Sequence, residues 1–172
     1  PESFDHWAFY VSGEPVSRPS PTGMLLANAG GRFHPHCSAV LIQPDMVLTA
    51  EHCIDALPSG RPVKIFFQNE GFFDVSRDAI QSPCAGDKET CSHDLAILPL
   101  VTASRITPVV FPASAQDAAP GARVRLAGFG ASNAVLADRG LLRMGASSIG
   151  ACNCDTATPP SDELLCFDTI RE

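Results

Sequence analysis

Short apolar runs, separated by segments rich in Gly, Pro, Ser or Asp, recur along the whole chain. Runs of this kind between turn-forming residues are typical of β-strands. No helical periodicity is sustained over a dozen residues, so the pattern predicts an all-β fold, either a barrel or a sandwich. The expected strands include residues 24–27, 39–42, 46–48, 63–67, 95–101, 124–127 and 164–167.

A segment rich in Pro and Ala, residues 106–122, carries little hydrophobic pattern and is typical of a connector. The 172 residues of the chain are enough for one sizeable core or two small ones. We therefore expect two units joined by this connector, the second shorter than the first.

The chain is acidic, with 19 Asp and Glu against 12 Lys and Arg and a formal net charge of -7. Nucleic acid and anionic membranes favour a basic face, so this balance argues against either partner. The apolar stretches are far short of the roughly 18 to 20 residues that a membrane-spanning helix needs. No signal-peptide pattern opens the sequence, so we expect an exported form to have lost its signal already.

Seven cysteines are a high count for a chain of 172 residues in a reducing cytosol. Their placement in close pairs favours disulfides in an exported protein, either secreted or periplasmic. Because the count is odd, either one thiol is free or one cysteine pairs with another chain.

Residues 37–53 read as a strand, a tight turn, a second strand and a short helical turn that bears His52. A disulfide between Cys37 and Cys53 would fix the loop that presents His52. A general base needs this restraint because it must lie within hydrogen-bond reach of its nucleophile. A histidine beside a cysteine is, taken alone, more often structural.

Asp94 precedes the apolar run at 95–101. A buried carboxylate there needs a partner. In a Ser-His-Asp triad the partner is the histidine, whose tautomer the carboxylate fixes and whose imidazolium it stabilises. An aspartate before a strand is by itself more often a turn residue or a cap. The order of the two motifs along the chain and the spacing of the cysteines nevertheless favour the pair His52 and Asp94 over any other titratable pair in this sequence.

Segment 37–53 resembles the histidine motif of the trypsin and chymotrypsin family of serine proteases, and residues 93–98 resemble its aspartate motif. Residues 126–130, Leu-Ala-Gly-Phe-Gly, resemble the Gly-Trp-Gly segment early in the second barrel of that family. The resemblance implies a trypsin-like double β-barrel whose second barrel is incomplete in this chain. Its implied divisions are an N-terminal extension or pro-segment at 1–10, a first barrel at 11–105, a connector at 106–122 and part of a second barrel at 123–172.

By the same resemblance the chain contributes to a serine endopeptidase that acts on a protein or peptide substrate, with His52 and Asp94 as its catalytic residues and with no cofactor or metal. No serine lies in the Gly-Asp-Ser-Gly-Gly context of the family nucleophile. Ser147 and Ser148 also do not fit a Gly-x-Ser-x-Gly elbow, and we expect them on a strand. The nucleophile is therefore expected on a companion C-terminal polypeptide, together with the oxyanion donors.

A catalytically inactive homologue that uses the fold as a protein-binding module is the alternative function. The presence of both His52 and Asp94 favours the protease, because a binding module has no chemical need for the pair.

Two segments depart from the family. Glu51 stands where the family has a small residue before its histidine; a carboxylate there would perturb the base or bind a cation, but we expect a solvent-exposed substitution. Val11 opens a segment that resembles the mature amino terminus of the family. Tyr10 precedes it in place of Arg or Lys, so a trypsin-like activator would not cut there. The chain is then either uncleaved or orders its active site differently, or the likeness of this segment is accidental.

Four of the five remaining cysteines are expected to form bridges. Cys84 and Cys91 bracket a short polar loop, and by resemblance Cys166 pairs with Cys152 or Cys154. The cysteine left over is a possible tie to the companion polypeptide. Neither the set His34, His36 and Cys37 nor the set Cys152 and Cys154 has the paired spacing of a zinc site, so we expect no metal.

Overall fold

The computed structural model describes residues 14–55, 57, 60–82, 94–111, 119–130, 139–150 and 166–167. Most elements in these ranges are β-strands, which confirms the predicted all-β class. Helical structure in the same ranges is confined to the one-turn helix α1 (His52–Asp55) and the 3-10 turn η1 (Arg77–Ala79). Within the described part of the chain, no helix is long and apolar enough to cross a membrane.

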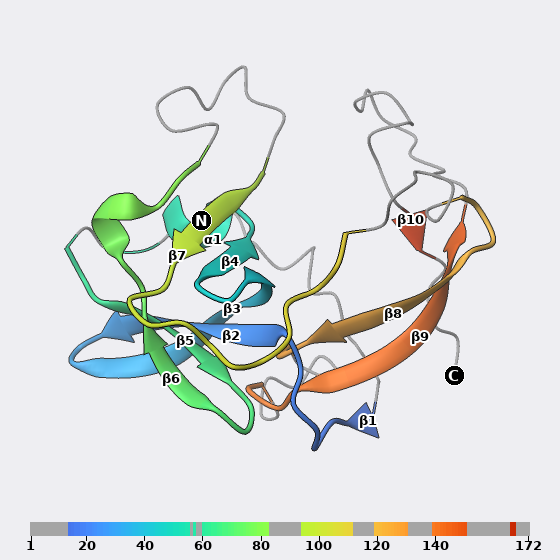
Figure 1. Ribbon diagram of the computed structural model, residues 1–172, viewed down its shortest axis with the longest axis horizontal. Helices are drawn as coiled ribbons and strands as arrows, with labels where there is room; N and C mark the ends of the chain where they lie inside the picture. Colours follow the sequence, from blue (N-terminus) through green and yellow to red (C-terminus); the bar gives the residue numbers. More distant parts are fainter. Residues whose placement is uncertain are drawn as a thin grey trace, which may run out of the picture.

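Six antiparallel strands form the first sheet, in the order β6-β5-β2-β3-β4-β7. A bridge between Val75 and Leu100 joins the ends of the two edge strands β6 and β7. The sheet therefore curls round until its edges meet, as Figure 1 shows. The strands are β2 (Thr22–Ala29), β3 (Arg32–Gln43), β4 (Met46–Thr49), β5 (Val63–Phe67), β6 (Gly71–Asp74) and β7 (Ala96–Pro99).

The core of this barrel follows from the two-residue period of its strands, because alternate side chains point to one face. Leu25 on β2, Leu41 on β3, Ile65 on β5 and Leu98 on β7 have no exposed surface. Strand β2 is buried on both faces, since Met24 and Leu26 pack outward against the second sheet while Leu25 points into the barrel. This explains why the sequence of β2 reads as a continuous apolar run.

The second sheet contains β1 (Glu14–Pro15), β8 (Arg123–Gly128), β9 (Arg143–Gly150) and β10 (Cys166–Phe167). Strand β9 pairs with β8 along its length, with β1 near one end and with β10 near the other. The sheet does not close over the described residues, so the second barrel is incomplete here. Strand β1 joins this sheet although it precedes the first sheet in the sequence, so the chain crosses between the sheets at its start.

An apolar cluster and several hydrogen bonds join the two sheets. Met24 and Leu26 pack with the buried Phe129 and Leu142. The backbone N–H of Phe129 donates to Ser38 Oγ at 2.9 Å, which connects the residue after β8 to β3. Figure 1 shows β8 and β9 lying beside the barrel on the side of β2. The second sheet therefore has a fixed position next to β3, which leads toward His52.

Candidate active site

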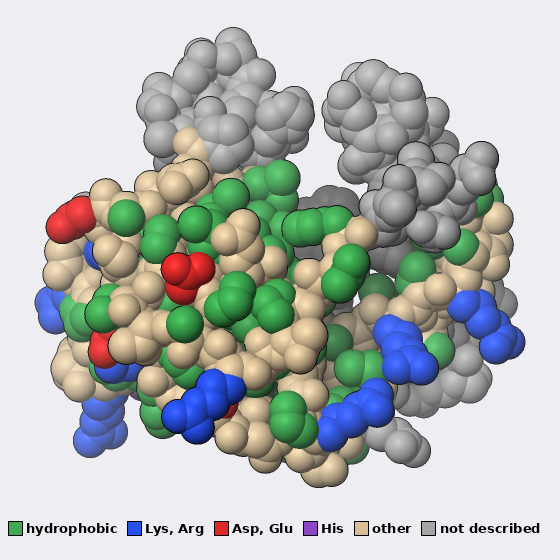
Figure 2. Space-filling view, viewed as in Figure 1, with side chains coloured by type: hydrophobic (Ala, Val, Ile, Leu, Met, Phe, Trp, Pro, Cys, Tyr) green, Lys and Arg blue, Asp and Glu red, His purple; other side chains and the backbone are tan. Residues whose placement is uncertain are grey.

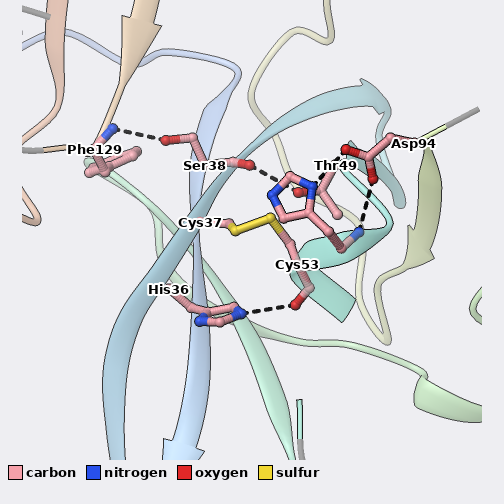
Figure 3. Close-up of a disulfide and its surroundings, with 8 residues drawn as sticks. His36, Cys37, Ser38, Thr49, Cys53, Asp94 and Phe129 are labelled. Carbon is pink, nitrogen blue, oxygen red and sulfur yellow. Dashed lines mark hydrogen bonds and ion pairs between the residues drawn. A yellow bond between two sulfur atoms is a disulfide. The ribbon is translucent and has the colours of Figure 1, made fainter. Parts of the chain in front are cut away.

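The turn that carries His52 is fixed by one covalent bond and several hydrogen bonds. Cys37 on β3 forms a disulfide with Cys53 of α1, with a Cα–Cα distance of 6.2 Å, so the predicted bridge is confirmed. Thr49, the last residue of β4, donates from Oγ1 to the carbonyl of Ser38 at 3.0 Å. The strand before the turn and the helix after it are thus both attached to β3 (Figure 3).

The strand pairing brings Asp94 to this turn. Strand β7 pairs with β4 so that Ala96 lies opposite Thr49. Asp94 comes two residues before Ala96, and His52 comes three residues after Thr49, so both extend past the same end of the paired strands. The antiparallel register therefore brings together two residues that are 42 positions apart in the sequence.

Asp94 accepts two hydrogen bonds from His52. Its Oδ2 accepts from the ring Nδ1–H at 2.6 Å, and its Oδ1 accepts from the backbone N–H at 2.9 Å (Figure 3). The side chain of His52 is 71% exposed, so the ring is open to an incoming group. The hydrogen bond to Asp94 therefore fixes the orientation of the ring, while most of the side chain remains accessible.

The environment of Asp94 favours its ionised form. Partial burial acts to raise the pKa of Asp94, but the hydrogen bonds from the backbone and the ring of His52, the attraction of an imidazolium and the N–H of Glu51 outweigh it. The pKa of Asp94 is therefore lowered. An ionised carboxylate can only accept, so Nδ1 of His52 carries the proton and Nε2 of the neutral ring is left as a base.

Glu51 corrects one expectation from the sequence. A solvent-exposed substitution was expected, but the residue is buried, with 8% of its surface exposed. Its carbonyl accepts from the N–H groups of Ile54 at 2.7 Å and Asp55 at 3.0 Å, and its own N–H donates to Asp94. These bonds hold the backbone of Glu51 at the start of α1.

The sulfur atoms of Cys37 and Cys53 and a ring nitrogen of His52 lie within 4.8 Å of one another. This set resembles a metal site in its composition. The two sulfurs are bonded to each other, however, so neither is available as the thiolate that a metal requires. We attribute the cluster to the disulfide that supports the histidine turn.

A groove of about 490 Å³ lies beside Asp94, between the barrel and β8. Figure 2 shows the surface hollowed between the barrel and the second sheet. Polar groups from both walls face the groove, among them Ser38, Thr49, Asp94 and Arg125. An element that docked there would reach Asp94 from the side of the second sheet.

Sequence reasoning found His52, Asp94 and the disulfide but missed the residues that support them. Ser38 and Thr49 adjoin the expected strands 39–42 and 46–48, and neither has a motif that signals a supporting role. Their hydroxyls form cross-strand contacts that depend on register, which a single sequence does not give.

The other serines and cysteines named from the sequence are placed as follows. Ser147 and Ser148 lie on β9, paired with Val124 and Arg123 of β8, as expected for strand residues. Other predictions concern residues outside the described ranges: Val11 and the 1–10 extension, His93, the pair Cys84 and Cys91, Cys152 and Cys154, and the side chain of Cys166.

The family model described as Trypsin matches residues 10–171, nearly the whole chain. The chain belongs to the trypsin family. This confirms the resemblance first seen in the segments around His52 and Asp94, together with the trypsin-like all-β fold. At the level of the family, the domain is of the serine protease type. No curated protein matches the chain.

Proposed function

We propose that this chain supplies the histidine and the aspartate of a serine endopeptidase, with His52 as general base and Asp94 as the carboxylate that orients it. The observation that carries the proposal is the 2.6 Å hydrogen bond from His52 Nδ1–H to Asp94 Oδ2, on a side chain that is largely exposed. A general base of this kind needs one ring nitrogen that is held by a hydrogen bond and a second that can accept a proton.

The proposed chemistry follows from this tautomer. Nε2 of His52 takes the proton of a serine hydroxyl as the serine oxygen attacks the carbonyl carbon of the scissile peptide bond. The resulting imidazolium then gives that proton to the leaving amine, and the peptide C–N bond breaks. Asp94 stays ionised throughout and stabilises the positive ring. Water later hydrolyses the acyl-enzyme with the same base.

The serine, the oxyanion donors and the specificity pocket are proposed to lie outside these 172 residues, on a companion C-terminal polypeptide. Three serines of the described residues have structural places instead. The hydroxyl of Ser38 accepts from Phe129 N–H, and Ser147 and Ser148 lie on a paired strand. The groove beside Asp94 is open along the incomplete second sheet and offers a place for the companion to dock. A protein or peptide is the proposed substrate.

A secreted or periplasmic location is part of the proposal. The disulfide between Cys37 and Cys53 supports it, because such bonds persist in oxidising compartments. We propose no cofactor or metal, since proton transfer by His52 and acyl transfer to serine need neither.

Peptide hydrolysis by the complete protein, purified together with its C-terminal polypeptide, tests this function. His52→Ala is expected to lower kcat by roughly 10⁴- to 10⁶-fold, because the base is lost while binding remains. His34→Ala is the matched control and should retain full turnover, since His34 is an exposed histidine on β3. Unchanged turnover in His52→Ala would contradict the assignment of His52 as the base, and a wild-type protein without hydrolytic activity would favour the protein-binding module instead.

A further inference from the structure

Strand β3 contains a β-bulge at His36. Leu25 of β2 pairs with Cys37, whereas the next residue, Leu26, pairs with Pro35. His36 is therefore the extra residue, with no partner across the strand pair. A bulge bends its strand and redirects the side chain of the extra residue.

The redirected side chain reaches the turn that carries His52. His36 Nε2–H donates to the backbone carbonyl of Cys53 at 3.0 Å. Figure 3 shows the His36 ring beside the disulfide, on the opposite side from Asp94. A carbonyl can only accept, so this bond also fixes the tautomer of His36, with its proton on Nε2.

The carbonyl of Cys53 needs such a donor. The carbonyls in the last turn of a helix have no partner within the helix, and α1 is only one turn long. Among the described residues, the backbone N–H groups around α1 donate to Ala50, Glu51 and Ile54 and none donates to Cys53. Among these described residues, His36 is the group that donates to the carbonyl of Cys53.

We propose that His36 is a positioning residue for His52, which acts by fixing the peptide group that follows Cys53. The disulfide restrains the distance between Cys37 and Cys53, but rotation about its bonds still allows the turn to tilt. The hydrogen bond from the neighbouring residue His36 adds a second restraint and fixes the orientation of the backbone. A tilt of the turn would strain both hydrogen bonds between His52 and Asp94, because one of them uses the backbone N–H.

The catalytic part of this inference rests on the proposed function, but the positioning part does not. Three substitutions separate the effects. His36→Phe keeps a ring of similar size and removes the donor, whereas His36→Gln offers an amide N–H to the same carbonyl. His34→Phe is the control, because His34 is exposed on the same strand, lies outside the bulge and has no hydrogen bond to another described side chain.

The first readout is the exchange of the His52 Nδ1 proton with solvent, followed by proton and nitrogen NMR in the complete protein. His36→Phe is expected to accelerate this exchange at least several-fold, His36→Gln to restore most of the wild-type rate, and His34→Phe to leave it unchanged. Equal exchange in wild type and His36→Phe, or equal acceleration in His34→Phe, overturns the inference. This readout needs no turnover, so it stands apart from the test of the proposed function.

The second readout is steady-state peptide hydrolysis. Misplacement of a catalytic group by about 1 Å can cost roughly 100-fold in rate, so His36→Phe is expected to lower kcat by about 10- to 100-fold with KM unchanged. His36→Gln should recover most of that loss. A change in KM alone would show that His36 contacts substrate and does not position the base, which overturns the inference.

Discussion

Asp94 binds His52 through both of its carboxylate oxygens, one to the ring Nδ1–H and one to the backbone N–H. One carboxylate therefore fixes two things: the rotation of the ring and the path of the turn that carries it. This double contact distinguishes the pair from an incidental surface ion pair, which fixes neither and contributes little to stability.

Replacement of Asp94 by Asn tests the role of the carboxylate. An amide placed with its NH₂ toward Nδ1 cannot accept from it and favours the opposite tautomer, in which Nε2 carries the proton and cannot act as a base. We expect Asp94→Asn to lower kcat for peptide hydrolysis by roughly 10⁴-fold with little change in KM. Asp74→Asn is the control, because Asp74 is an exposed aspartate at the end of β6 that is paired with Lys64. Similar rates in the two variants would contradict the assignment.

Stability should depend on pH through Asp94. Its folded pKa is lowered below the ordinary value of about 3.9. The stabilisation is therefore complete above the unfolded pKa and is lost as the pH falls through the lower, folded pKa. The carboxylate is 56% exposed, so the whole effect should stay below about 1 kcal/mol.

Urea unfolding of wild type and Asp94→Asn between pH 6 and pH 2 measures this effect. The difference in unfolding free energy should be largest near pH 6 and shrink in the acid range. A difference that grows as the pH falls would mean that the folded protein favours the neutral carboxyl.

The disulfide should contribute to both stability and geometry. In the chain-entropy treatment, the 16-residue separation between Cys37 and Cys53 corresponds to about 3 kcal/mol. We expect the double variant with both cysteines changed to Ser to lose about that much unfolding free energy in urea. Mass mapping of a nonreduced digest should yield one linked peptide pair; free thiols at both positions would contradict this part of the fold.

The predictable part of the structure comes from local patterns. Strand β5 alternates buried and half-buried residues as its sequence indicates, and segment 37–53 forms the strands, turn and helix that were expected. Strand β9 carries Ser147, Ser148 and two glycines, so it has no apolar run, although its serines were expected on a strand. It forms because β8 pairs with it along most of its length, which is a tertiary effect.

The bulge at His36 and the burial of Glu51 could not be predicted from the sequence, and the reason is again tertiary. A bulge depends on the register between β2 and β3, and a one-residue slip reverses which side chains face outward. Glu51 is buried where its backbone meets Asp94, a residue far away in the sequence. Both features are set by pairings between distant segments.

Ser38 should couple the barrel to the second sheet. Its hydroxyl is the acceptor for the N–H of Phe129, a residue that is 4% exposed. Ser38→Ala removes that acceptor, and an unsatisfied buried N–H costs about 1 to 3 kcal/mol. We expect unfolding in urea to show a loss at the lower end of that range, because Ser38 itself is exposed. Hydrogen exchange at the Phe129 amide should accelerate in the variant; unchanged exchange would exclude this contact as a link between the sheets.

Labelling with a serine-directed fluorophosphonate tests the central claim most directly. The complete protein is labelled with and without His52→Ala, digested, and mapped by mass spectrometry, with His34→Ala as the control. The account predicts a single labelled serine outside these 172 residues, with a labelling rate that falls at least 1,000-fold in His52→Ala and not in the control. The account is contradicted by an absence of label in the wild-type protein, by a label on a serine of this chain, or by equal rates in wild type and His52→Ala.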